Sequence, residues 1–180
     1  MFADLAEQLR KREQQGLWRT RQIADSPQAS HITIDGRDYL AFSSNEKKLY
    51  ASGGNDNWII GFNIVSGKLV PADTIVLGKP WPELISPAGL AVDDEKKILY
   101  VVTKENNHLY IVNLKTKKSD SVALGAEAYT CRLSPNKREL YISLWGGDKI
   151  LIYDTRLKRI TNRIAVGDNP NDICLTKNGK

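Results

Sequence analysis

The stretch at residues 90–113, "LAVDDEKKILYVVTKENNHLYIVN", contains three short apolar segments separated by charged or asparagine-rich turns. Segments such as "ILYVVT" are rich in β-branched and aromatic residues, which is typical of strands. The "ENN" segment supplies asparagines, which tolerate the left-handed backbone that tight hairpins need. The stretch therefore predicts three antiparallel strands joined by short turns.

The same pattern occurs twice more without a gap. The first copy is "LAFSSNEKKLYASGGNDNWIIGFN" at 40–63, and the third is "CRLSPNKRELYISLWGGDKILIYD" at 131–154. Two alignment positions illustrate the repeat: one holds Tyr50, Tyr100 and Tyr141, and the other holds Asn63, Asn113 and Asp154. A fourth copy begins at Ile173, so successive copies start 50, 41 and 42 residues apart.

A fourth strand follows each complete copy, at "DTIVLG", "SDSVALG" and "TNRIAVG". Four antiparallel strands in roughly 40 residues form one blade of a β-propeller. The sequence therefore predicts an all-β fold, a partial β-propeller of about three four-stranded blades. The predicted blades span about 40–78, 88–125 and 129–167, with the start of a fourth at 171–180.

"LYVVTKENNHLYIVNLKTKK" and "VGDNPNDICLTKNGK" resemble the YVTN-repeat propellers, which have seven blades. The likeness is to the propeller that precedes an alkaline-phosphatase-superfamily phosphoesterase domain in bacterial proteins. The chain departs from the family in blade number. Lactonase-like propellers place acidic and basic residues toward the central channel, where blades begin. By this resemblance Glu127, Arg132 and Asp172 are candidate channel-facing residues.

The first 45 residues have a different composition. They hold all five glutamines, and five of their six basic residues are arginine, whereas 15 of the 20 basic residues that follow are lysine. An apolar stripe beginning at Phe2 and Leu5 predicts a short amphipathic helix. "HITIDGRDYLAFSSN" predicts a β-hairpin that turns at Asp35 and Gly36. We therefore expect a helix plus hairpin over 1–39 and the partial propeller over 40–180.

"LWRTR", "SPQ" and "DGRDYLAFSSN" resemble the N-terminal segment of 8-amino-7-oxononanoate synthase, a pyridoxal-phosphate enzyme of biotin synthesis. In that family an arginine lies near the carboxylate of the acyl substrate. Arg19 would match it by position, with Arg21 as the alternative. Pyridoxal phosphate needs a Schiff-base lysine, an acid beside the pyridinium nitrogen and a phosphate site. The resemblance places these groups in a large domain outside this segment, so we expect the chain to use no cofactor.

Net charge is +5, and the lysines are spread over the turns of every repeat. This distribution favours a solvated surface over a nucleic-acid site, which needs clustering on one face. No apolar run approaches the roughly 20 residues of a membrane span. The N-terminus as written has no secretory signal, which predicts a cytoplasmic protein, although the propeller family is often exported. Cys131 and Cys174 are predicted to be buried strand residues, with no metal site.

Together these features predict a non-catalytic binding or scaffold module in a chimeric or truncated chain. No partner is identified, and open blade faces would favour self-association. The first alternative is a synthase fragment without its catalytic domain. The second is part of a propeller-type lactonase or phosphoesterase.

Overall fold

The computed structural model describes residues 32–34, 37–39, 41–44, 47–53, 56–66, 68–79 and 82–176. The helix predicted near the N-terminus lies outside these residues. Contacts divide the chain into two units, Met1–Ser30 and His31–Lys180, and all the described residues lie in the second unit.

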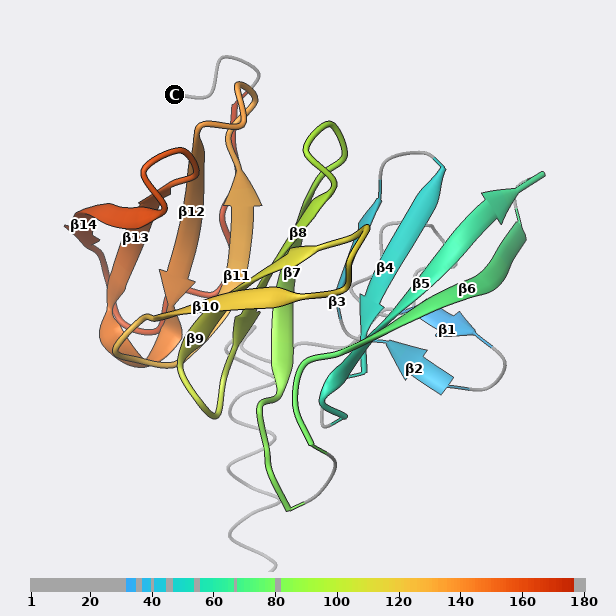
Figure 1. Ribbon diagram of the computed structural model, residues 1–180. Helices are drawn as coiled ribbons and strands as arrows, with labels where there is room; N and C mark the ends of the chain where they lie inside the picture. Colours follow the sequence, from blue (N-terminus) through green and yellow to red (C-terminus); the bar gives the residue numbers. More distant parts are fainter. Residues whose placement is uncertain are drawn as a thin grey trace, which may run out of the picture. The chain divides into compact units, whose positions relative to one another are not determined.

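Three four-stranded antiparallel sheets follow one another along the chain (Figure 1). The first sheet contains β3 (Ala41–Ser44), β4 (Lys48–Ser52), β5 (Trp58–Val65) and β6 (Lys68–Val76). The second contains β7 (Pro87–Asp93), β8 (Ile98–Thr103), β9 (His108–Asn113) and β10 (Ser119–Ala123). The third contains β11 (Ala128–Leu133), β12 (Glu139–Leu144), β13 (Lys149–Asp154) and β14 (Arg159–Ala165), with the 3-10 turn η1 (Trp145–Gly147) between β12 and β13. Each strand pairs with the next, which confirms the predicted partial propeller.

A two-stranded sheet precedes the propeller strands. It pairs β1 (Ile32–Ile34) with β2 (Arg37–Tyr39) in antiparallel fashion. Ile34 lies opposite Arg37, so two residues connect the strands. This register confirms the predicted hairpin with its two-residue connection.

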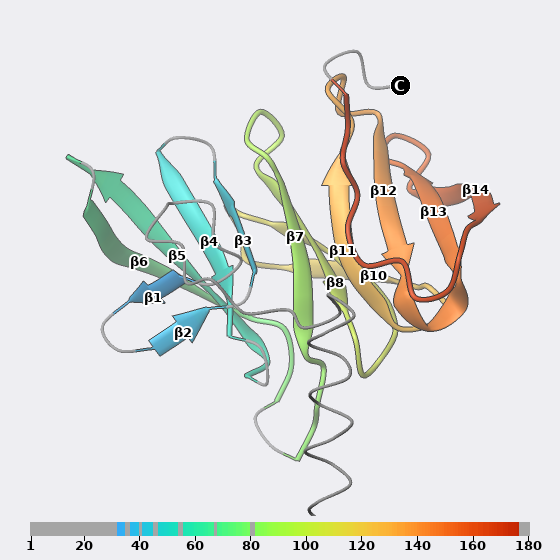
Figure 2. The same cartoon turned by 180° about the vertical axis from the view of Figure 1, so that it is seen from behind.

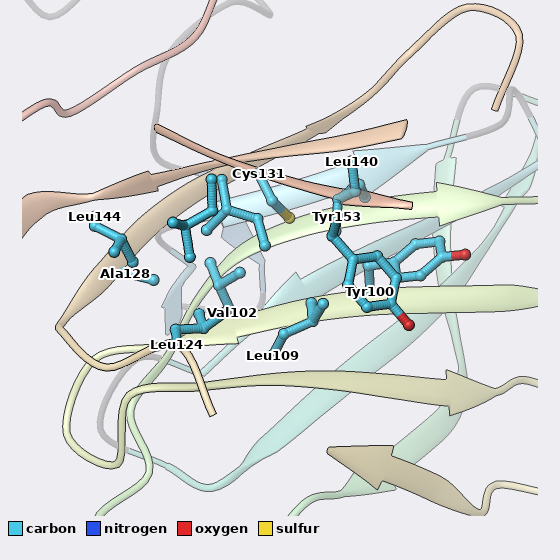
Figure 3. Close-up of a cluster of buried hydrophobic side chains, with 12 residues drawn as sticks. Tyr100, Val102, Leu109, Leu124, Ala128, Cys131, Leu140, Leu144 and Tyr153 are labelled. Atoms are coloured by element: carbon cyan, nitrogen blue, oxygen red, sulfur yellow. The ribbon is translucent and has the colours of Figure 1, made fainter. Parts of the chain in front are cut away.

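The first strands of successive sheets, β3, β7 and β11, lie side by side (Figures 1 and 2). Facing sheets bury apolar side chains between them, as the blades of a propeller do. The core between the second and third sheets includes Tyr100, Leu109, Leu140 and Tyr153, all at most 1% exposed (Figure 3). The rings of Tyr100 and Tyr153 meet edge to face, with centroids 6.3 Å apart. A second core, which includes Tyr50, joins the first sheet to the second.

The repeated tyrosine shows which sheet faces are covered. Tyr50 and Tyr100 are 3% and 1% exposed, because each packs in the core shared with the following sheet. Tyr141 is only half-buried, and its hydroxyl donates to Glu139 Oε2 at 2.8 Å. Tyr141 alternates along β12 with Leu140, which packs toward the second sheet, so it lies on the opposite face of the third sheet.

The first sheet differs from the others in the register of its first strand. Tyr100 pairs with Ala91 and Tyr141 with Arg132, at corresponding positions of the repeat. The alignment therefore predicts that Tyr50 pairs with Ala41, but Tyr50 pairs with Ser43 instead. The register of β3 is thus shifted by two residues, an even number that preserves the alternation of the pleat. The shift lies where the composition of the sequence changes.

The turns after β9 and β13 have the chemistry that the repeat predicts. Asn113 Oδ1 accepts the backbone N–H groups of Lys115 and Thr116. Asp154 Oδ1 accepts those of Arg156 and Leu157. An Asn or Asp side chain that bonds the backbone two or three residues onward stabilises a tight turn, which explains the repeated residue at this position.

Each of these turns ends in a lysine with a left-handed backbone, and one of them provides a stability test. Lys158 has a φ of 53°, a region that glycine occupies without the steric cost paid by a residue with Cβ. Lys158→Gly is expected to raise the free energy of unfolding by about 1 kcal/mol in urea titrations. Arg156→Gly in the same turn is the control and should lower it. A loss of stability in Lys158→Gly would contradict the argument.

Candidate functional site

Two of the three predicted channel residues lie together. Arg132, near the end of β11, forms an ion pair with Asp172, with Nη2 and Oδ1 3.4 Å apart. Its Nε also donates to the carbonyl oxygen of Ile173 at 3.3 Å. Arg132 thereby attaches the segment after β14 to the first strand of the third sheet. Both side chains of the ion pair are exposed, at 49% and 72%.

Glu127 immediately precedes β11, at the end of the strand far from Arg132. Its Oε1 is 3.6 Å from Lys104 Nζ, and the same ammonium lies 5.1 Å from the ring centroid of Tyr129. Five residues of extended chain span roughly 16 Å, so Glu127 and Arg132 do not act on one small ligand. That these residues face a channel stays a prediction, and Arg19 lies outside the described residues.

The two cysteines have different environments. Cys131 is fully buried in the core between the second and third sheets, as predicted. Burial raises the pKa of its thiol to about 12, which keeps it protonated and unreactive at neutral pH. Cys174 is exposed, so its predicted burial is wrong. It lies in an irregular segment after β14, which the described sheets leave accessible.

A buried carboxylate lies where the second and third sheets meet. Asp93 is fully buried, and its Oδ1 accepts the backbone N–H of Lys96 at 3.2 Å. The ammonium of Lys96 is 3.6 Å from Oδ2, and that of Lys137, from the third sheet, is 3.9 Å from Oδ1. Lys137 also pairs with Glu95 at 2.7 Å. The alignment places Ser134 where the second sheet has Asp93, so this charged contact is specific to one pair of sheets.

A second carboxylate links the first and second sheets. Asp73, in β6, lies 3.2 Å from Lys48 Nζ in its own sheet and 3.2 Å from Lys117 Nζ in the next. Partial burial raises the pKa of Asp73, but the hydrogen bonds from Lys48 and Lys117 outweigh it and place the pKa below its ordinary value of 3.8. The two ammonium groups therefore stabilise the ionised form of Asp73.

The two contacts of Asp73 predict that the stability of the fold depends on pH. Because the folded state lowers the pKa of Asp73, the stabilisation is present above about pH 4 and is lost as the pH falls through the folded-state pKa. Asp73→Asn should therefore be less stable than the parent at pH 7, and the difference in free energy of unfolding should narrow toward pH 2. Urea titrations of the variant and the parent at several pH values measure this difference. Asp120→Asn, at the corresponding place in β10, is the control. A gap that is constant with pH would contradict the assignment.

Two hollows lie between adjacent sheets, one of about 290 Å³ between the first and second and one of about 260 Å³ between the second and third. Lysines predominate in the first hollow. Within the described residues no group of His, Cys, Asp and Glu is arranged to hold a metal ion. The same part of the chain contains no helix long and apolar enough to cross a membrane.

Comparison with solved structures places the fold among β-propellers. The chain is similar to Kuenenia stuttgartiensis hydrazine synthase, with a TM-score of 0.69 and 16% identity over 86% of this chain and 44% of that one. It is also similar to the periplasmic gluconolactonase PpgL of Pseudomonas aeruginosa, with a TM-score of 0.57 and 16% identity over 73% of this chain and 40% of that one. At such identities the likeness shows the fold alone. The chain spans less than half of either structure.

Sequence comparison gives a different relative for the N-terminal region. That region is similar to the 8-amino-7-oxononanoate synthases of Nitrosomonas europaea, at 59% identity over 46 residues, and Hahella chejuensis, at 48% over 59 residues. The two matches cover 26% and 33% of this chain, but only 12% and 14% of the synthases. No protein-family model matches the chain. The chain therefore combines a synthase-like N-terminal segment with a partial propeller.

Proposed function

We propose that residues 40–180 act as a non-catalytic, propeller-type binding module, and that residues 1–39 are a synthase-like segment fused to it. The observation that carries the non-catalytic part of this proposal is the pairing of the charged residues at the two ends of β11. Arg132 is paired with Asp172, and Glu127 is paired with Lys104 at the far end of the strand. These charges are arranged to hold segments of the protein together, whereas general acid–base catalysis needs groups that converge on one substrate atom.

The fusion rests on the first sheet. The register of β3 is shifted by two residues, and β3 lies close to where the 46-residue similarity to synthases must end if it starts near the N-terminus. The segment "LAFSSN" suits both parents, since it continues a hairpin in one and forms a first strand in the other. A sequencing read of the source DNA across codons 40–50 tests the fusion. A read in which the two halves lie in separate genes would exclude it.

The absence of catalysis is tested with substrates of the two alternatives. The purified chain is expected to hydrolyse neither gluconolactone nor p-nitrophenyl phosphate above the buffer rate. With pyridoxal phosphate it should give no absorbance band near about 420 nm, where Schiff bases of this cofactor absorb. Hydrolysis that is lost in Arg132→Ala would overturn the proposal in favour of a propeller hydrolase. A band near 420 nm would favour the synthase alternative.

Self-association is the second part of the binding role. The half-buried face of the third sheet around Tyr141 corresponds to the faces that the first and second sheets bury against a following sheet. Within the residues that the structure describes, no further sheet covers this face, and a sheet face of this kind favours association. Light scattering coupled to size-exclusion chromatography should therefore show species larger than the monomer. A monomer at all concentrations would count against this part of the proposal.

A further inference from the structure

The hollow between the first and second sheets lies at the turns that precede β4 and β8 and follow β9. Its charged and apolar lining includes Lys47, Lys48, Asp94, Lys97, Leu114 and Lys115. Four ammonium groups and one carboxylate give this lining a net charge of +3. We call this hollow the lysine groove.

Two ion pairs lie in or beside the lysine groove. Asp94 Oδ1 lies 2.7 Å from Lys97 Nζ, which neutralises one lysine of the lining. Asp73 contacts Lys48 from beside the groove, but it also pairs with Lys117. Adding Asp73 and Lys117 to the count therefore leaves the net charge at +3. The hydrogen bond to Asp73 raises the pKa of Lys48, which keeps its ammonium charged at neutral pH. By count, the ammonium groups in and beside the groove therefore outnumber the carboxylates by three.

The lining indicates which anion fits. Lysine ammonium groups are common phosphate ligands, which they bind as point charges. A phosphate monoester carries a charge of about −1.5 to −2 at neutral pH, so it matches several ammonium groups better than a single carboxylate does. Tyr50 also lines the groove, and burial raises the pKa of its hydroxyl, so it remains a neutral phenol. The volume is near the lower end of the roughly 300–1,000 Å³ of ligand pockets. We infer that the lysine groove binds a small phosphate ester, with Lys48 and Lys115 supplying charge. This inference rests on the proposed binding role.

The hollow between the second and third sheets is an internal control. By alignment Tyr100 takes the place of Tyr50 in its lining, and Ile98 takes the place of Lys48. Its lining contains two lysines, Lys118 and Lys158, and one carboxylate, so its net charge is +1. Two hollows of similar size and position thus differ mainly in charge.

The test titrates the full chain with glycerol 3-phosphate, followed by calorimetry in about 150 mM salt, which screens exposed charges. The parent chain is expected to bind saturably at one site. Lys115→Gln removes one charge from the groove, and Lys48→Ile introduces the residue of the second hollow. Each is expected to weaken binding about fivefold to tenfold, as loss of one close charge does. Lys118→Gln, in the second hollow, should bind as the parent does.

Two outcomes would overturn the inference: no saturable binding by the parent, or equal weakening by Lys118→Gln and Lys115→Gln. If Lys48→Ile proves unfolded by circular dichroism, Lys115→Gln decides alone, because Lys115 is exposed. Inorganic phosphate is assayed in the same samples. Release of phosphate from glycerol 3-phosphate would overturn the non-catalytic role while supporting the site. If the chain neither binds glycerol 3-phosphate nor releases phosphate from it, the site alone is overturned.

Discussion

Replacing Gly89 with valine is expected to lower the free energy of unfolding by about 3 kcal/mol, the upper end of the usual cost of overpacking. Gly89 lies in β7, against the backbone of β11. A Cβ at this position would lie 2.6 Å from Thr130 Cα and 2.8 Å from the Cys131 backbone nitrogen. Backbone atoms of a strand that is held in its own sheet cannot move aside as a side-chain end does, so the first strands of the second and third sheets would have to separate.

Urea titration followed by circular dichroism measures this loss. Gly167→Val is the matched control, because a Cβ at Gly167 meets no atom within 4 Å. Its unfolding midpoint should remain close to that of the parent. A Gly89→Val midpoint equal to that of the control would mean that β7 and β11 do not approach as described.

Leu109→Ala is the second large expected effect. Leu109, in β9, is fully buried in the core between the second and third sheets (Figure 3). Removing a fully buried leucine side chain loses its transfer free energy and leaves a cavity, which costs about 3 kcal/mol. The same denaturation experiment should show this loss, because the cavity would lie in the packed core between two sheets.

Val65→Ala is the control for Leu109→Ala. Val65 is 54% exposed at the end of β5, so its truncation should cost less than about 1 kcal/mol. If Leu109→Ala cost no more than Val65→Ala, the second and third sheets would not share a packed core.

The repeat in the sequence was sufficient to predict the three sheets, because each strand pairs with its neighbour in the chain and each turn carries its own chemistry. Asn113 and Asp154 illustrate this, since their alignment anticipates the turns that their side chains stabilise. The two-residue shift of β3 was not predictable, since the apolar residues of the alignment fit either register. Only the backbone pairing of Ser43 with Tyr50 reveals it.

The candidate site was less accessible to sequence reasoning. Glu127 and Arg132 are close in the chain, which suggested a common site, but an extended strand separates them and gives each a different partner. The lysine groove unites Lys48 with Lys115, which are distant in the chain, and local patterns do not report such proximity. A count of charged residues for each pair of neighbouring repeats would have detected it.

The carboxylates between the sheets have a consequence for how such proteins evolve. Asp73 binds Lys117 of the following sheet, and Asp93 is approached by Lys137 of the sheet after it. Each junction therefore has its own complementary pair, although the repeats share one architecture. A duplicated or shuffled repeat would leave each acid only the cation of its own sheet, Lys48 or Lys96, and would break the contact across the junction. Such pairs therefore favour the original order of the repeats.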